Sequence, residues 1–338
     1  MTNKTKATTF DELLARHKAM EAEIFGTPEE QKTLSPLAEN AYKTAFGDFL
    51  HGEHPTNALS AGRDGSGGYL IPDELERQLI EGLAETNVLR NIGTVMKIDH
   101  DRKIPVVKTK GVAYFVDEEG VILESDDAFE QVKLGSYKAV TETKVSEELL
   151  EDSAFDLESY IIREFARRIG DLEEDSFVTG TGVGMPLGLI NSAPIGAVTD
   201  SDSVVTPDDL LDLLYSVPDK YRAKSHWLFS EDLEYKLRKL RLMNGRPMFE
   251  DAMDTGDVDR FLGYPVLTCR TLPKIEPGAK VALFGDFSYL WIADRGRPSF
   301  KRLDELYAKS GQIGFRATKR VDAKLVLPEA VKVLQVKE

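Results

Sequence analysis

The 338-residue sequence predicts an α+β fold in which helices and strands are mixed without the regular βαβ repeat of a doubly wound sheet. Three observations lead to this prediction. Apolar residues alternate with a period of two between residues 95 and 143, a long helix with a single apolar stripe follows, and the remainder interleaves short helices with short apolar strands. The composition, 41% hydrophobic and 30% charged, is ordinary for a globular chain with a sizeable core.

The first 60 residues are predicted to be separate from the rest. TTFDELLARHKAMEAEIFG has a short helical pattern, and a polar, glycine-rich stretch without a steady period follows it. The next segment, GGYLIPDELERQLIEGLAE, is typical of a helix start, because Pro72 precedes Asp73 and Glu74, whose charges suit the positive end of a helix dipole. The helix carries one apolar stripe, formed by Leu75, Leu79, Ile80 and Leu83.

From Val95 to Thr143 the pattern is that of strands. VMKI and KIPVV are expected to be strands, and the residues from AYFVDEEG to ETKV a long two-stranded excursion. Seven acidic residues occur there between 117 and 130 with no Lys or Arg among them: Asp117, Glu118, Glu119, Glu124, Asp126, Asp127 and Glu130. One interpretation is a solvated hairpin tip, and the other is an arm that lies on a basic partner.

A basic counterpart occurs near the C-terminus. Between residues 295 and 324, nine basic residues outnumber three acidic ones, which leaves a net charge of +6. The basic residues are Arg295, Arg297, Lys301, Arg302, Lys309, Arg316, Lys319, Arg320 and Lys324. An acidic arm and a basic strip on one chain suit head-to-tail contacts of a self-assembling subunit. Pairing within one chain would explain the same charges.

A long helix is predicted from Asp156 to about Thr179, with Ser146 or Asp156 as the cap. At ~1.5 Å per residue it would be roughly 35 Å long. Its apolar residues recur at helical spacing and are Leu157, Ile161, Phe165, Ile169 and Leu172. A single stripe on so long a helix predicts that it lies against a sheet.

The remaining segments alternate between helix and strand. TPDDLLDLLYSV starts with Thr206 as N-cap and Pro207 at the first helical position, and EDLEYKLRKLRL is a second helix. The predicted strands are HWLFS, YPVLTC, KVALFGDF, YLWIAD and IGFRATKRVDAKLVL.

The glycine-rich stretch FVTGTGVGMPLGLI raises the question of a phosphate site. A dinucleotide fingerprint needs GxGxxG between a strand and a helix, but here Met185 stands where the third glycine should be, and the stretch leaves a helix. We therefore predict a turn after the helix C-terminus, formed by Gly180, Gly182, Gly184 and Pro186.

No catalytic, cofactor or metal site is predicted. Cys269 lies in an apolar strand pattern and is expected to be an inert core thiol. Of the five histidines only His51 and His54 are close in sequence, without Cys or carboxylate ligands at metal-binding spacing. The adjacent acids Glu173 and Glu174 are expected to be solvated or intersubunit charges. No GxSxG motif is present.

Charge and hydropathy exclude further classes. A formal net charge of −15 argues against a general nucleic-acid binder. The N-terminus lacks the apolar region of a secretory signal, and no apolar run approaches the ~18–20 residues of a membrane helix, so no membrane association is expected.

The order of these pieces resembles the major capsid proteins of tailed phages with the Hong Kong 97-like fold. The resemblance covers roughly residues 60–338 and is most specific at the long helix with its TGTGVGMPLGL junction. It implies a helical, scaffold-like segment at 1–60, an N-terminal arm at 61–103 and an extended E-loop at 104–142. It further implies a peripheral domain from 143–190 and 286–325, and an axial domain from 191–285 and 326–338.

By the same resemblance, the chain would form homo-pentamers and homo-hexamers of an icosahedral shell around packaged double-stranded DNA, without sequence-specific binding. Its partners would be a scaffolding protein, a portal protein and, further, a prohead protease and a decoration protein. It would be located in the virion capsid after assembly in the bacterial cytoplasm. The E-loop of one subunit crosses a neighbour's peripheral domain in this family, which would pair the acidic segment with the basic strip.

The sequence departs from the type member in two ways. Lys108, Lys110 and Lys133 are candidate donors for its lysine–asparagine crosslink, but residues 292–338 contain no asparagine, so we expect no such crosslink. The segment before GGYLIP is about 60 residues, shorter than the type member's scaffolding domain. The alternatives are an encapsulin-type compartment, an α+β enzyme with an unrecognised site, and a tail or connector protein.

Overall fold

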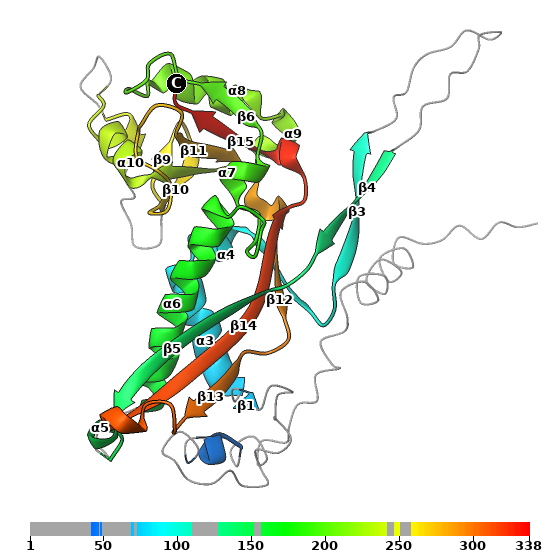
Figure 1. Cartoon of the computed structure of the whole chain (residues 1–338). Coiled ribbons are helices and arrows are strands. Elements are labelled where there is room, and N and C mark those ends of the chain that lie inside the picture. The colour runs from blue at the N-terminus through cyan, green and yellow to red at the C-terminus, as the bar shows by residue number, and fades with distance from the viewer. Residues whose placement is uncertain are drawn as a thin grey trace, which may run out of the picture.

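Two β-sheets, a long helix and a projecting pair of strands organise the chain (Figure 1). The computed structural model describes residues 42–46, 48, 69–70, 73–109, 128–151, 157–241, 247–250 and 258–338. One lobe contains a six-stranded sheet backed by helices, and the other contains a seven-stranded sheet. The predicted mixture of helices and strands is confirmed.

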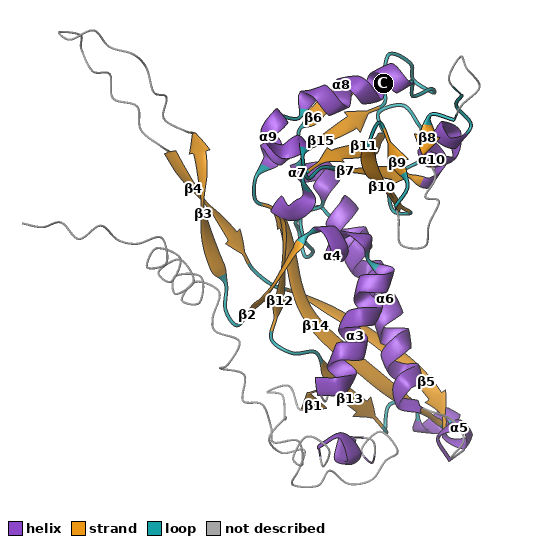
Figure 2. Cartoon of the chain, turned by 180° about the vertical axis from the view of Figure 1, so that it is seen from behind, coloured by secondary structure: helices purple, strands orange, loops and turns teal. Residues whose placement is uncertain are grey.

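The six-stranded sheet has the order β1-β13-β14-β12-β2, and β5 also pairs with β14. Its strands are β1 (Tyr69–Leu70), β2 (Thr94–Ile98), β5 (Tyr137–Ser146), β12 (Leu290–Arg295), β13 (Ser299–Leu303) and β14 (Gln312–Leu325). The helices α3 (Asp73–Thr86), α4 (Val88–Ile92), α5 (Glu147–Glu151) and α6 (Leu157–Thr179) belong to the same lobe. Figure 2 shows α3 and α6 together on one side of this sheet.

The helix α6 begins and ends close to the predicted positions. Four residues of its apolar stripe, Leu157, Ile161, Phe165 and Ile169, are no more than 1% exposed and join the core between helices and sheet. Leu172, the fifth predicted member, is 48% exposed, so the prediction is wrong there. At 100° per residue Leu172 lies on the same side of the helix as Ile161 and Phe165, so the helical spacing alone does not reveal its exposure.

The seven-stranded sheet has the order β6-β15-β11-β7-β10-β9-β8. Its strands are β6 (Ile195–Val198), β7 (His226–Ser230), β8 (Phe249–Glu250), β9 (Arg260–Phe261), β10 (Tyr264–Cys269), β11 (Lys280–Gly285) and β15 (Val331–Gln335). The helices of this lobe are α7 (Leu189–Ser192), α8 (Pro207–Ser216), α9 (Asp219–Arg222) and α10 (Glu231–Arg238). Thr206 and Asp209 form a capping box at the start of α8, as its sequence indicates.

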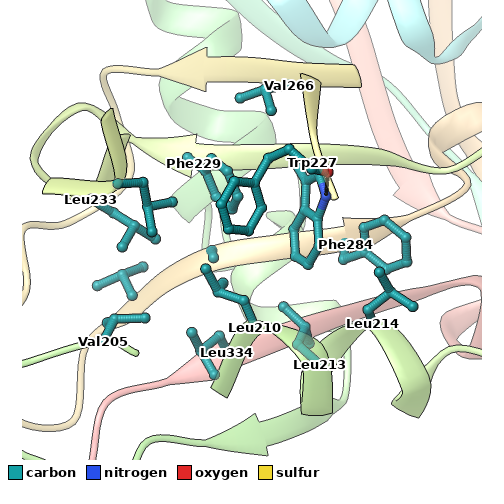
Figure 3. Packing of buried hydrophobic residues seen from close by; sticks show 14 of the residues in the cluster. Val205, Leu210, Leu213, Leu214, Trp227, Phe229, Leu233, Val266, Phe284 and Leu334 are labelled. Atoms are coloured by element: carbon teal, nitrogen blue, oxygen red, sulfur yellow. Dashed lines mark hydrogen bonds between the residues drawn. The ribbon is translucent and has the colours of Figure 1, made fainter. Parts of the chain in front are cut away.

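An aromatic cluster fills the core of this second lobe (Figure 3). Trp227 lies against Phe284 with ring centroids 4.3 Å apart and against Phe229 at 5.2 Å. Leucines 210, 213 and 214 of α8 approach the same cluster from below in the view. The indole N–H of Trp227 donates a hydrogen bond of 2.9 Å to the Phe261 carbonyl, so its polar atom is satisfied.

The projecting pair consists of β3 (Arg102–Thr109) and β4 (Ala128–Leu134), antiparallel with Ile104 opposite Val132. The predicted two-stranded excursion from AYFVDEEG to ETKV is wrong in its pairing: β3 lies before it and pairs with β4, whereas β5, its second half, pairs with β14 in the six-stranded sheet. The base of the pair is attached to the six-stranded sheet: the Gly135 N–H donates to Asp322 at 2.7 Å, and the Lys324 ammonium donates to the Lys133 carbonyl at 2.6 Å.

Residues 42–46, sequence YKTAF, form a helical turn that packs into the first lobe. Tyr42, Ala45 and Phe46 are buried in the same cluster as α3 and α6, while Thr44 is exposed. The prediction that the first 60 residues are separate is therefore wrong for this turn. The four-residue spacing of Tyr42 and Phe46 is the signal that was missed.

Candidate functional site

The outer face of the six-stranded sheet is the candidate site. Strands β5 and β14 pair from Ser146 opposite Gln312 to Tyr137 opposite Val321. Alternate residues, among them Val145 and Phe315, are buried toward the helices, so their neighbours in sequence point to the other face. In Figure 1 that other face is turned toward the viewer, and no described helix lies over it.

Positive charge gathers on this outer face. The outward positions of three adjacent strands carry six cations, Lys138 and Lys144 on β5, Lys301 on β13, and Arg316, Arg320 and Lys324 on β14. Lys138 lies directly opposite Arg320, and Lys301 directly opposite Arg316. Like charges at directly opposite positions repel each other, and an anionic partner bound to this face would reduce that repulsion.

Glu142 is the one carboxylate at the outward positions of β5 described here. It accepts two hydrogen bonds from Arg316, at 2.9 and 3.0 Å, and one from the Tyr307 hydroxyl. The bond from Tyr307 and the guanidinium of Arg316 hold the pKa of Glu142 below its usual value, so it stays ionised. Among the described residues, Lys138, Lys301 and Arg320 form no ion pair. The outer face therefore keeps an excess of positive charge.

Three other residues of the predicted basic strip are used within the chain. Arg295 binds Asp101 at 3.0 Å, Arg297 binds Glu76 at 2.6 Å, and Arg302 binds Asp304 at 2.5 Å. The alternative of pairing within one chain, left open by the sequence, thus holds for these arginines. These ion pairs fix the base of the projecting strands and the connections around β13. Because the arginines are neutralised there, they add little positive charge to the outer face.

Lys319 is not a surface residue, which corrects its place in the predicted strip. Its side chain is 6% exposed and binds Glu173 at 2.9 Å and Asp294 at 3.1 Å. Arg90 of α4 binds the same two carboxylates, at 2.7 Å to Glu173 and 2.8 Å to Asp294. Two cations and two anions from α4, α6, β12 and β14 therefore form one compact network.

The charges of this network support one another. Burial raises the pKa of Asp294, but the attraction of Lys319 and the hydrogen bonds from Arg90 outweigh it and bring the pKa to about 2. Burial lowers the pKa of Arg90, and the charge of Glu173 with the bonds to Asp294 reverses that direction. The prediction that Glu173 is a solvated charge is wrong, because its side chain is 1% exposed at the centre of the network.

The predicted acidic segment lies almost wholly outside the described residues. Asp117, Glu118, Glu119, Glu124, Asp126 and Asp127 belong to the undescribed range 110–127. Glu130 lies in β4, opposite Val106 of β3.

The glycine-rich stretch forms a tight turn after α6, which ends at Thr179. Thr181 and Leu187 pair across the turn, and Gly182 and Gly184 between them have φ angles of 80° and 71°. Gly180 has no room for a side chain, because a Cβ would collide with the carbonyl oxygens of Ser176 and Pro186. The Gly188 N–H donates to the Gly180 carbonyl at 2.8 Å, so the two arms of the turn are hydrogen-bonded to each other.

A groove of about 1080 Å³ between α6 and α10 gathers the titratable side chains that a catalytic site would need. Six carboxylates and three arginines line it: Glu85, Asp171, Glu174, Asp175, Glu231, Glu234, Arg167, Arg238 and Arg270. Burial raises the pKa of Glu174, which accepts a 3.2 Å hydrogen bond from the Cys269 thiol. Burial, with the charge of Glu174 added to it, raises the pKa of Cys269 to about 12, so the thiol is protonated and is not a nucleophile.

No group of three or more His, Cys, Asp or Glu side chains in the part of the chain that the structure describes is arranged to hold a metal ion. None of its helices has the length and apolar character to cross a bilayer.

Comparison with known proteins identifies the family. Residues 67–336 match the model of the phage capsid family. The chain belongs to the phage capsid family. The phage capsid family consists of structural proteins and not of enzymes. Membership in it therefore assigns no catalytic role to the groove beside α6.

Known capsid proteins are similar to this chain over about three quarters of its length. The major capsid protein of Klebsiella oxytoca phage phiKO2 is 24% identical over 264 residues, which cover 74% of this chain and 60% of the relative. This chain thus spans about three fifths of that relative's length. The capsid of a native GTA particle, computed with C5 symmetry, superposes with a TM-score of 0.65 at 26% identity, covering 75% of this chain and 91% of the other.

A structure from Mycobacterium phage Adephagia has a TM-score of 0.56 at 19% identity, covering 75% of this chain and 90% of the other. At that identity the likeness concerns the fold alone.

Proposed function

We propose that this chain is a major capsid protein that assembles into pentamers and hexamers of an icosahedral shell around double-stranded DNA. The observation that carries the proposal is the family match across residues 67–336, together with a likeness to a solved GTA capsid that extends over 91% of that chain. An acidic subunit, with a net charge of −15, suits a container that must not adhere to its genome.

The proposal assigns a part of the Hong Kong 97-like subunit to each described region. The strands β3 and β4 would form the base of the E-loop, expected from the sequence at residues 104–142, while β5 (Tyr137–Ser146), which pairs with β14, would belong to the peripheral domain. The lobe with α6 and the six-stranded sheet would be the peripheral domain, and the lobe with the seven-stranded sheet the axial domain around the symmetry axes. The turn from Gly180 to Gly188 supports this division, because the chain passes from α6 into the second lobe there.

The outer basic face would receive the acidic segment of a neighbouring copy. Seven carboxylates between residues 117 and 130 are opposite in charge to the cations of β5, β13 and β14, so the two surfaces are complementary. Each exposed pair contributes only about 0–1 kcal/mol, but a closed shell repeats the contact in every subunit. A scaffolding protein, a portal protein, a prohead protease and a decoration protein are the partners that such a shell would need, in the bacterial cytoplasm where it would assemble.

Negative-stain electron microscopy tests the proposal. The protein is expressed alone and, in parallel, with candidate scaffolding proteins. Closed shells or rings of five and six subunits are the expected result, and encapsulated DNA rather than copurified enzyme cargo separates a phage shell from an encapsulin-type compartment. A protein that stays monomeric at high concentration in both preparations would contradict the proposal.

A further inference from the structure

Different helices cover the two ends of the seven-stranded sheet. Helix α8 contacts β6, the edge strand at one end, and β15 beside it, whereas α10 contacts β7 and β10 toward the other end. Figures 1 and 2, which view the chain from opposite sides, both place α8 and β6 on one side of the second lobe and α10 with β9 on the other. The lobe thus has two separate surfaces, the α8 end at residues 198–219 and the α10 end at residues 235–241.

The α8 end is acidic. Residues 199–219 include six aspartates and no lysine or arginine. Asp209 is used within the lobe by the capping box of α8, and Asp219 binds Arg222 at 2.5 Å. The other four carboxylates are exposed and have no ion-pair partner among the described residues, and they belong to Asp200, Asp202, Asp208 and Asp212. The α8 end therefore carries an excess of negative charge.

The α10 end is basic. Residues 235–241 contain four cations and no acidic residue. Lys236 binds Asp232 at 3.0 Å, and Arg238 binds Glu234 at 2.7 Å, so these two cations are paired at the start of the same helix. Two further cations are exposed and make no ion pair within the described part of the chain, Lys239 and Arg241. The α10 end therefore keeps an excess of positive charge.

Each end also exposes large apolar side chains. Val198, Val204 and Tyr215 of the α8 end are more than half exposed, and so is Tyr235 of the α10 end. The Lys239 ammonium lies 3.7 Å from the centroid of the Tyr235 ring, so charge and ring form one surface. Interfaces between proteins combine an apolar centre, enriched in tyrosine, with a polar rim. Both ends have this composition.

Because the two ends are opposite in charge, the partner that each end fits is a second copy of this chain. Two α8 ends repel each other, and so do two α10 ends, whereas an α8 end attracts an α10 end. A contact between two different surfaces of identical subunits is heterologous, and its repetition forms a ring when the rotation between neighbours closes. With its two ends on opposite sides of the lobe, each copy can contact two neighbours at once.

We propose that the second lobes of neighbouring copies join head to tail, with the α8 end of one copy bound to the α10 end of the next. The exposed aspartates of the first then face Lys239 and Arg241 of the second, and Tyr215 and Tyr235 lie within the contact. This inference rests on the proposed shell and specifies the two surfaces that meet inside its rings. It involves neither the outer basic face nor the acidic segment 117–130.

Charge reversal and its rescue test the contact. One variant carries Asp202→Lys and Asp212→Lys, and the other carries Lys239→Glu and Arg241→Glu. In either variant like charges meet at the contact, so the protein concentration needed for rings or shells should rise by about tenfold. A chain with all four changes should assemble at the concentration of the parent, because each reversed end again meets an opposite charge. Melting temperature and circular dichroism of each variant show whether it is folded.

A mixture of the two reversed variants gives a second readout. Opposite charges meet in the mixture only where the two variants alternate around a ring, so rings of six subunits should form and rings of five should not. Negative-stain electron microscopy distinguishes the two kinds of ring. Rings of five in the mixture, as abundant as in the parent, would contradict the head-to-tail contact.

Two further outcomes would overturn the inference while the proposed function stands. One is assembly of a reversed variant at the parent's concentration, and the other is a folded chain with all four changes that does not recover assembly. If a reversed variant melts below the parent, the neutral changes Lys239→Gln and Arg241→Gln take its place and should still raise the concentration needed, by a smaller factor. A parent that stays monomeric with and without a scaffolding protein would contradict the proposed function together with the inference.

Discussion

Arg90 donates two hydrogen bonds to Asp294, from Nη2 to Oδ1 at 2.8 Å and from Nη1 to Oδ2 at 3.0 Å, and so connects α4 to β12. The same guanidinium donates through Nε to Glu173 of α6. Because the geometry is bidentate and the side chains are largely buried, this arginine cannot be exchanged for a lysine or an apolar residue without loss.

Replacing Arg90 by leucine should destabilise the fold by about 3–5 kcal/mol, because Glu173 and Asp294 would keep only Lys319 as a buried counter-charge. Urea unfolding followed by circular dichroism measures the change. The matched control is Arg167→Leu, since Arg167 makes exposed pairs with Glu164 and Asp171. That control should cost less than about 1 kcal/mol. An equal decrease in the free energy of unfolding for the two variants would show that the buried network stabilises the fold no more than an exposed ion pair does.

The stability supplied by Asp294 should depend on pH in a defined window. Its pKa is lowered from 3.8 to about 2 in the folded protein, so the folded state favours the ionised form. The contribution is complete above about pH 5 and is lost as the pH falls through about 2. The difference in unfolding free energy between the parent and Asp294→Asn should therefore shrink over this range. A difference that stays constant down to pH 2 would refute the assignment.

Gly180→Ala should be far more damaging than Gly184→Ala. The added methyl at Gly180 meets two fixed carbonyl oxygens, whereas nothing lies within 4 Å of a Cβ at Gly184, where only the φ of 71° is unfavourable. The cost at Gly184 should be about 1–2 kcal/mol. Thermal unfolding of the purified variants compares them. If Gly180→Ala melts within a degree of the parent, the turn is not as rigid as its contacts indicate.

Reversing charge on the outer basic face should weaken assembly. In the double variant Lys301→Glu and Arg320→Glu, attraction to an acidic segment becomes repulsion, and the protein concentration needed for shells should rise by about tenfold, which corresponds to about 1.4 kcal/mol. Light scattering at low and high salt follows this, since salt screens exposed charges. Arg163→Glu, an exposed change on α6, is the control. If the double variant assembled at the same protein concentration as the parent, the outer basic face would not be part of the subunit interface.

Cys269 should be unreactive in the folded protein. It is buried, and its pKa of about 12 leaves almost no thiolate at pH 8. A chromogenic thiol reagent should titrate no thiol in native buffer and one in denaturant. Rapid reaction of the native protein would mean that the groove beside Glu174 opens to the thiol.

Much of the fold could be predicted because local signals agree with the tertiary structure. The start of α8 is an example, since Thr206, Pro207 and Asp209 each favour the same boundary. The helix α6 was equally clear, because its apolar residues keep a helical spacing for most of its length. The short strands β1, β6 and β13 were not predicted individually, because they are defined by their neighbours in the sheets rather than by their own patterns.

The candidate site could be predicted only in outline. Clustered cations at 295–324 indicated a charged surface, but sequence cannot tell an outward lysine from an inward one. Lys319 and Arg320 are adjacent, yet Lys319 turns toward Glu173 and Arg320 toward solvent, because successive residues of a strand point to opposite faces. Lys138 and Lys144, which complete the face, were missed because they lie more than 150 residues before the strip in sequence.

Strands β14 and β15 have a consequence for biosynthesis. Strand β14 lies between β13 and β12 in the first sheet, and β15 lies between β6 and β11 in the second, so each sheet waits for a strand that is synthesised after its neighbours. A growing chain on the ribosome therefore lacks an inner strand of the first sheet until residue 325 has been added, and of the second sheet until residue 335 has been added. A polypeptide that stops before β14 cannot present the completed basic face and would be kept out of any lattice that depends on it.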